Sequence, residues 1–290
     1  MATMTNTRTW SVLELINWSK AYLEEKGFDN ARLEVELLLS CALELPRIEL
    51  YLQFDRQMKQ EELAAFKALF KRRLAGEPVQ YVTGTAGFML GEFEVNPAVL
   101  IPRPETEALT ELVLKMLMEA RIGSADAHES EAGGRAISPG SAEGASGAGE
   151  ADAAERPGPP DHAESQLIVA DVGTGSGVIA TTIAAKVPSA RVYATDVSSA
   201  ALEVAARNAE RAGVTERVMF LEGEMLQPLL GEGLAGKVTA IVSNPPYIPT
   251  GELAGLQAEV RDFEPRAALD GGEDGLECLR VLVQDGPELL

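Results

Sequence analysis

Cysteine, histidine and long apolar runs are scarce in this chain of 290 residues. The two cysteines, Cys41 and Cys278, lie far apart without a metal-ligand spacing, which fits a reducing compartment. The two histidines, His128 and His162, fall in a polar stretch, which argues against histidine-based catalysis and a histidine-ligated metal. No apolar run reaches the length of a membrane span, and residues 1–8 lack a secretory apolar region. We expect a cytoplasmic protein with no membrane partner and no metal.

Basic residues are the other shortage. The chain has 25 Lys and Arg against 45 Asp and Glu, which gives a formal net charge of −20. Such a chain lacks the broad basic surface that holds nucleic-acid phosphates. We therefore expect no stable nucleic-acid binding and favour a protein or small-molecule substrate.

One stretch, residues 124–165, concentrates this acidity. It contains nine acidic and two basic residues, and Ala, Gly, Ser, Pro and Glu dominate it. Ile137 is its one large aliphatic residue. Because so little apolar area cannot offset the entropy lost on ordering, the composition predicts a disordered acidic insertion.

The first part of the chain has the apolar spacing of helices. Ser11 and Glu14 form a capping-box pattern before the first helix. A second helix is expected to end before Pro46 and a third at Gly76. We predict an N-terminal helical domain over residues 1–78, which serves either packing alone or substrate docking.

A glycine-punctuated segment and a proline-rich loop come next. The apolar pattern of Val79–Val99 predicts a β-hairpin. The loop IPRPETE, Ile101–Glu107, then opens a helix expected at Thr106–Met118, since acids suit the positive end of a helix dipole. We assign the hairpin and this connecting helix to residues 79–123.

Short apolar strands alternate with helices in the last part, residues 166–290. Strands are expected at Leu167–Asp171, Arg191–Thr195, Val218–Leu221 and Val238–Val242, and helices at Val178–Lys186 and Ala200–Ala212. This alternation predicts a parallel α/β sheet with helices on both faces and a ligand site beyond the carboxyl ends of the strands. After Tyr247 the pattern indicates a loop and one helix around Leu276–Val283.

A glycine-rich turn after the first of these strands is a candidate ligand site. It consists of Gly173, Thr174, Gly175, Ser176 and Gly177. Glycines let the backbone approach a ligand closely, and Asp196, about 20 residues further on, could accept both ribose hydroxyls. A tight turn without any ligand is the alternative reading.

The spacing of this turn bears on the kind of ligand. Gly-x-Gly-x-Gly differs from the Gly-x-Gly-x-x-Gly of dinucleotide enzymes, and Asp171 beside it would repel a pyrophosphate. S-adenosylmethionine, whose sulfonium and amino-acid parts carry no phosphate, is therefore favoured. A nicotinamide oxidoreductase is the rival, but the sequence offers no His or Tyr–Lys pair for hydride transfer.

The tetrapeptide Asn244, Pro245, Pro246 and Tyr247 follows the last expected strand. The Asn244 amide oxygen and the Pro245 carbonyl can accept both hydrogens of a planar amino group and stabilise the charge that grows on its nitrogen. Tyr247 can pack on the flat target group. Since this chemistry needs no general base, the pattern predicts an amino-nitrogen methyltransferase. A mere Pro-Pro turn would leave the flanking Asn and Tyr unexplained.

Several segments together resemble the peptide-chain release-factor glutamine methyltransferases of the HemK/PrmC type. They are ARLEVELLL at 31–39, GEPVQYVTG at 76–84, IPRPETE, DVGTGSG, ATDVS, SNPPYI and EPRAALDGGEDGL at 264–276. The Asn-Pro-Pro-Tyr tetrapeptide also resembles that of DNA and rRNA adenine methyltransferases, so an adenine N-methyltransferase acting on DNA or RNA is the alternative. The helical N-terminal module and IPRPETE favour the release-factor enzymes.

The resemblance implies a function for the whole chain. It implies S-adenosylmethionine-dependent methylation of the glutamine amide nitrogen in the Gly-Gly-Gln motif of class I release factors. The implied fold is a Rossmann-like methyltransferase sheet with a small N-terminal helical domain. The implied donor site comprises Gly173, Thr174, Gly175, Ser176, Gly177, Asp196, Met225 and Asn244. Asn244 to Tyr247 are implied to hold the glutamine, and a monomer is expected.

The sequence also departs from the family pattern. The family normally lacks anything like residues 124–165. Met225 stands where the family often has an Asp followed by an aromatic residue near the adenine. The family continues with further strands after the last helix, so we expect C-terminal strands to be missing from the sheet and the methyltransferase domain at 166–290 to be incomplete. A non-catalytic binding module derived from the enzyme is therefore a third alternative.

Overall fold

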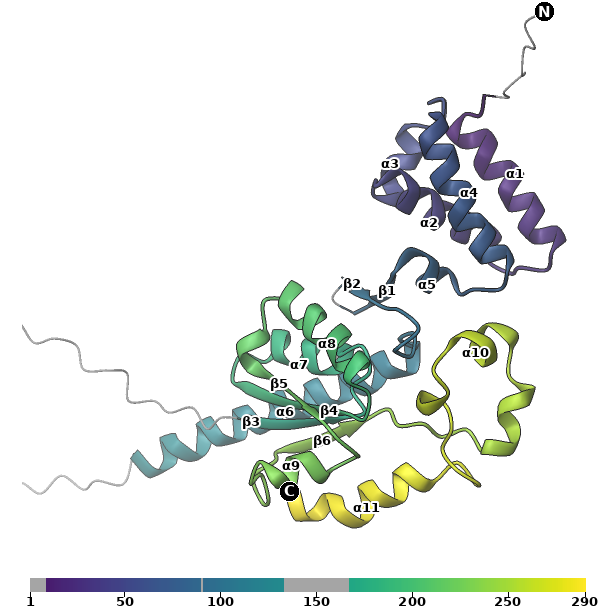
Figure 1. The fold of residues 1–290 in the computed structure, drawn as a ribbon. Helices are drawn as coiled ribbons and strands as arrows, with labels where there is room; N and C mark the ends of the chain where they lie inside the picture. The colour runs from purple at the N-terminus through teal and green to yellow at the C-terminus, as the bar shows by residue number, and fades with distance from the viewer. Residues whose placement is uncertain (1–8, 90, 133–166) are drawn as a thin grey trace, which may run out of the picture.

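The computed structural model describes residues 9–89, 91–132 and 167–290. Figure 1 shows a cluster of helices at the N-terminal end, a parallel sheet flanked by helices, and a looped segment near both that carries helix α10. None of the helices in the described ranges is both long and apolar enough to cross a membrane.

The N-terminal part consists of short helices around one apolar core. They are α1 (Val12–Glu25), α2 (Ala31–Leu43), α3 (Arg47–Leu52), α4 (Gln60–Leu74) and α5 (Val79–Thr83). The predicted capping box is confirmed: Glu14 N donates to Ser11 Oγ at 3.2 Å, and Ser11 N donates to a Glu14 carboxylate oxygen at 2.8 Å. Fully buried side chains such as Ile16, Leu38 and Phe66 hold these helices together.

The predicted hairpin begins later than its apolar pattern suggested. Val79–Thr83 is the helix α5, and the antiparallel strands are β1 (Thr85–Phe88) and β2 (Gly91–Glu94). The prediction was wrong for the first segment because Val79 and Val82, three residues apart, both pack into the N-terminal core. Gly84, with a left-handed φ of 78°, ends this helix before the hairpin.

Helix α6 runs over Pro104–Ala132, well beyond the expected end at Met118. Its buried residues Val113, Leu114 and Leu117 pack on the sheet. The expected insertion at 124–165 therefore begins inside a helix, and our prediction of disorder is wrong for residues 124–132. The rest of that prediction lies outside the described residues.

The central sheet is parallel, as predicted, with the order β5-β4-β3-β6. Its strands are β3 (Leu167–Val172), β4 (Ala190–Asp196), β5 (Val218–Glu222) and β6 (Ala240–Ser243). Strand β6 starts two residues later than expected, since Val238 N instead donates to the Leu289 carbonyl at 2.9 Å. In this order β6 lies at one edge of the sheet.

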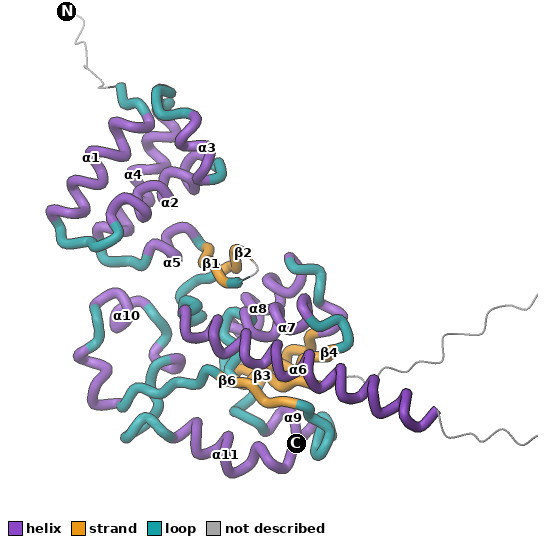
Figure 2. Tube along the Cα trace, turned by 180° about the vertical axis from the view of Figure 1, so that it is seen from behind, coloured by secondary structure: helices purple, strands orange, loops and turns teal. Residues whose placement is uncertain are grey.

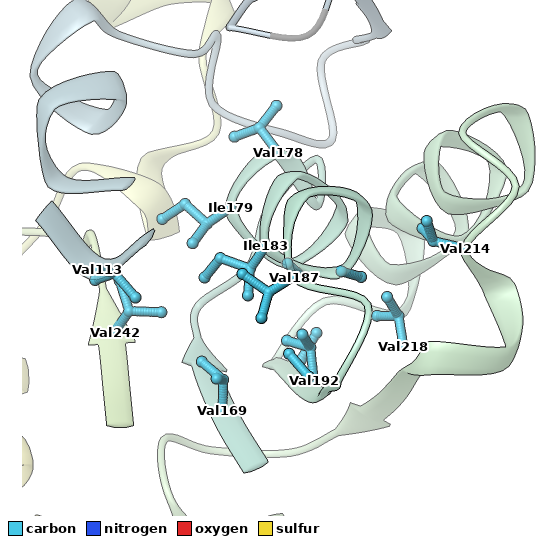
Figure 3. Close-up of a cluster of buried hydrophobic side chains, with 14 of the residues drawn as sticks. Val113, Val169, Val178, Ile179, Ile183, Val187, Val192, Val214, Val218 and Val242 are labelled. Atoms are coloured by element: carbon cyan, nitrogen blue, oxygen red, sulfur yellow. The ribbon is translucent and has the colours of Figure 1, made fainter. Parts of the chain in front are cut away.

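Helices cover both faces of the sheet (Figures 1 and 2). On one face lie α6, α7 (Val178–Lys186) and α8 (Ser199–Arg211), and on the other α9 (Gln227–Gly231) and α11 (Glu277–Leu289). Figure 3 shows Ile183 of α7 above Val169 of β3 and Val192 of β4, with Ile179 on the side of Val113 of α6 and Val242 of β6. Aliphatic side chains of this kind are buried on both faces of the sheet, and their burial drives the layered packing.

The segment between β6 and α11 holds more structure than the loop we expected. It contains α10 (Ala258–Phe263) and short 3-10 helices at Thr250–Gly255 and Arg266–Ala268. The buried Arg73 of α4 makes ion pairs with Glu34 and with Glu259 of α10. This segment therefore ties the N-terminal helices to the part of the chain that carries the sheet.

Candidate active site

A cavity of about 370 Å³ lies at the carboxyl ends of the strands, where the topology predicts a ligand site. Most of the predicted site residues line it: Gly173, Thr174, Gly175, Ser176, Asp196, Met225, Asn244 and Pro246. Gly177, Pro245 and Tyr247 are not among its lining residues. The fold thus brings together residues that the sequence spreads over about a quarter of the chain.

The glycine turn adopts a conformation that only glycine takes without strain. Gly173, Gly175 and Gly177 have φ values of 72°, 55° and 76°. A side chain on Gly177 would place a Cβ 2.8 Å from the Cβ of Ala205 on α8. Around Gly173 and Gly175 there is open space, so the first two glycines leave room at the cavity and the third lets α8 pack close.

The carboxylate of Asp196 holds this turn from the tip of β4. One carboxylate oxygen accepts a hydrogen bond from Gly175 N and the other from Ser198 N, both at 2.9 Å. The residue is partly exposed and lines the cavity. Its orientation is therefore set by the backbone, with part of the side chain left open to a ligand.

Asp171 lies beneath the turn and outside the cavity lining, contrary to our expectation that it would face the ligand. Its side chain is fully buried. One oxygen accepts hydrogen bonds from Thr174 Oγ1 at 2.6 Å and Ala180 N at 3.1 Å, while the other has no partner among the described residues. Burial raises the pKa of Asp171 to about 7, and the charge of Asp196 adds to this.

Replacing Asp171 with Asn should make stability less sensitive to pH. The folded state holds this proton more tightly than the unfolded chain, so wild-type stability falls as the pH rises from about 4 to about 7. We expect Asp171→Asn to raise the melting temperature by about 5 °C at pH 8 and by much less at pH 5. Scanning calorimetry checks this. A gain in melting temperature of equal size at both pH values would contradict the raised pKa of Asp171.

The Asn-Pro-Pro-Tyr segment leaves the end of β6 beside the glycine turn. Asn244 Nδ2 donates a hydrogen bond to Thr106 Oγ1 at 3.0 Å. Tyr247 is 62% exposed and is not among the residues that line the cavity. The backbone after it is fixed, because Ile248 N donates to the Leu269 carbonyl at 3.0 Å and Gly271 N donates to the Ile248 carbonyl at 2.9 Å.

Two further segments close the cavity, and the sequence reasoning did not assign them to it. Lining residues come from IPRPETE (Pro102 and Thr106) and from the 264–276 segment (Pro265, Ala267, Ala268 and Asp270). The two segments are joined because the buried Glu264 carboxylate binds Arg103 and accepts a hydrogen bond from Ile101 N at 3.3 Å. Both segments are recognisable motifs in the sequence, and this is the feature from which they could have been assigned to the site.

Comparison with known proteins decides the family. Residues 14–84 match the family described as PrmC N-terminal domain, and residues 161–258 match the methyltransferase small domain. The release factor glutamine methyltransferase of Geobacter sulfurreducens is 40% identical over 281 residues, which cover 97% of this chain and 81% of that relative. This chain belongs to the release factor glutamine methyltransferase family.

Two other family members match along nearly the same length. The relative from Chlorobaculum tepidum is 40% identical over 287 residues, with 99% of this chain and 84% of the relative covered. The relative from Moorella thermoacetica is 41% identical over 264 residues, with 91% and 76% covered. The chain is therefore an enzyme with an S-adenosylmethionine-dependent methyltransferase fold. The match gives no support to a nicotinamide oxidoreductase, a nucleic-acid adenine methyltransferase or a non-catalytic module.

Proposed function

We propose that this enzyme methylates the side-chain amide nitrogen of the glutamine in the Gly-Gly-Gln motif of class I peptide-chain release factors. The observation that carries the proposal is the position of Asn244, which meets the glycine turn at one cavity in a chain 40% identical to a release factor glutamine methyltransferase. The likeness extends over 97% of the chain, so it includes the N-terminal helices as well as the sheet.

The cavity fits S-adenosylmethionine as the methyl donor. Its volume of about 370 Å³ lies in the range of small-molecule sites. Gly173 and Gly175 expose backbone to it without a Cβ, and the Asp196 carboxylate can accept the two ribose hydroxyls. Met225, which also lines the cavity, offers its side chain to the adenine. When bound, the donor supplies an electrophilic methyl group on a sulfonium.

The residues after β6 act on the acceptor. An amide nitrogen is a poor nucleophile because its lone pair is delocalised into the carbonyl. Asn244 Oδ1 and the Pro245 carbonyl would accept the two hydrogens of the target amide and stabilise the positive charge that develops on its nitrogen as the sulfur–methyl bond breaks. One of these hydrogens then leaves as a proton to solvent, which gives the neutral methylated amide. The prolines keep these acceptors in place, which lowers the cost of orienting the target. The exposed ring of Tyr247 is available to pack against the incoming glutamine.

In this proposal each domain of the chain has its own role. The helical domain at 1–78 docks the release factor, and residues 166–290 form the methyltransferase domain. Residues 79–123, the hairpin and the helix after it, connect these two parts. The ion pair of Arg73 with Glu259 supports communication between docking and chemistry, because α10 belongs to the segment that also lines the cavity. The enzyme works as a monomer in the cytoplasm and forms no stable nucleic-acid complex, which its net charge of −20 supports.

Methyl transfer to defined acceptors tests the proposal. The enzyme is incubated with isotope-labelled S-adenosylmethionine and a class I release factor, the same factor with its Gly-Gly-Gln glutamine replaced by alanine, or DNA. We expect label only in the intact factor, and peptide mapping should place it on that glutamine. Label in the glutamine-to-alanine factor would overturn the assigned acceptor, and label in DNA would support the adenine alternative.

A further inference from the structure

The hydroxyl group of Thr106 is the one described protein group that binds the Asn244 side chain. Thr106 lies in the first turn of α6, is 5% exposed, and accepts the hydrogen bond from Asn244 Nδ2 at 3.0 Å. Both residues line the cavity. Among the residues that the structure describes, none donates to Asn244 Oδ1, so that oxygen is free to accept from a bound group.

We propose that Thr106 is a positioning residue that holds the Asn244 amide with its oxygen toward the acceptor glutamine. The inference rests on the proposed function, in which Asn244 Oδ1 receives a hydrogen from the target amide. A primary amide carries two donors at one end and an acceptor at the other. Rotation by half a turn would place two NH2 groups face to face, and the acceptor needed during transfer would be lost. The contact with Thr106 holds the amide in place, and it opposes that rotation as long as the hydroxyl accepts from Nδ2 and does not donate to Oδ1.

Thr106 itself is fixed by its surroundings. Its N–H donates to the Arg103 carbonyl at 3.0 Å. The loop before it is anchored by Glu264, which binds both Arg103 and Ile101 N. A hydroxyl on a helix that is braced in this way is a rigid partner, which is what orienting another side chain requires.

Removing the hydroxyl while keeping the shape of the side chain tests the inference. We expect Thr106→Val to lower kcat for methylation of the release factor about tenfold, the usual effect of one hydrogen bond lost in the transition state. The Kd for S-adenosylmethionine and the KM for the release factor should stay within about twofold, because no binding contact changes. Thr106→Ser, which retains the hydroxyl, should recover most of the rate.

A matched control separates positioning from packing. Thr110 lies one turn further along α6 and is fully buried, and its hydroxyl serves only the helix backbone. Thr110→Val should lower the melting temperature without a selective loss of kcat. In the Asn244→Ala background, Thr106→Val should have almost no further effect on the rate. A full tenfold loss in that background, or equal losses in Thr106→Val and Thr106→Ser, would overturn the inference.

A measurement without substrate distinguishes this inference from the proposed function. In the 15N-labelled enzyme, the side-chain NH2 signals of Asn244 are identified as the pair absent from Asn244→Ala. We expect Thr106→Val to shift this pair upfield and Thr106→Ser to leave it near its original position. Unmoved signals in Thr106→Val would refute the contact whichever acceptor the enzyme uses. Shifted signals in an enzyme that ignores release factors would refute only the proposed substrate.

Discussion

Replacing Asn244 with Ala is expected to lower the rate of methyl transfer about a hundredfold or more. The substitution removes the acceptor that stabilises charge growing on the amide nitrogen, and loss of one such preorganised group typically costs that much in kcat. It also leaves Thr106 Oγ1 without the hydrogen bond that it accepts from Asn244. The measurement is single-turnover transfer of labelled methyl to a release factor.

Donor binding is the internal control for this variant. Gly173, Gly175 and Asp196 keep their conformations, since the contacts that set them do not involve Asn244. The Kd for S-adenosylmethionine, measured by calorimetry, should therefore change by less than about threefold. Such a change corresponds to less free energy than one typical hydrogen bond contributes. Unchanged turnover in Asn244→Ala would refute the proposed role of Asn244, and a lost donor affinity would mean that Asn244 acts on the donor instead.

Replacing Gly177 with Ala is expected to cause a large loss of stability together with loss of donor binding. A Cβ at this position would lie 2.8 Å from the Cβ and 3.0 Å from the Cα of Ala205, so α8 must move. The left-handed φ of 76° adds strain of about 1–2 kcal/mol, and overpacking adds about 1–3 kcal/mol. We expect the melting temperature to fall by about 10 °C and donor affinity at least tenfold.

Gly213 provides the matched control for this clash. Its φ of 68° is also left-handed, but a Cβ there would meet nothing within 4 Å. Gly213→Ala should therefore lower the melting temperature by only about 3 °C, from backbone strain alone, with donor affinity unchanged. Thermal unfolding and calorimetric titration of both variants test this. Equal losses in the two variants would show that strain, and not the approach of α8, is what Gly177 avoids.

The order of strands and helices in the sheet could be predicted from the sequence because it rests on local patterns. Short aliphatic runs such as Leu167–Val172, each followed by a turn and an amphipathic or apolar helix, have few alternatives to a parallel sheet. The glycine turn and the Asn-Pro-Pro-Tyr segment could be placed at its carboxyl edge for the same reason, since each directly follows a strand. Most of the predicted donor site therefore meets at one cavity.

Local patterns failed where tertiary contacts decided the outcome. Val79–Thr83 has apolar residues that suit a strand, yet it is helical because Val79 and Val82 share the N-terminal core. Asp171 was expected at the ligand, but the fold buries it under the turn with Thr174 and Ala180 as partners. The direction in which a side chain points depends on which neighbours pack around it, and spacing in the sequence does not contain that information.

The contacts that hold the residues of the acceptor site in place were decided by tertiary structure alone. The sequence by itself determined that Asn244 follows a strand and that Thr106 opens a helix. The hydrogen bond between them joins residues 138 positions apart and exists because α6 packs along the sheet beside β6. Likewise, Glu264 reaches Ile101 and Arg103 only after the segment following β6 folds back over the cavity. Such contacts arise from the packing of whole elements, which positions side chains that no local pattern relates.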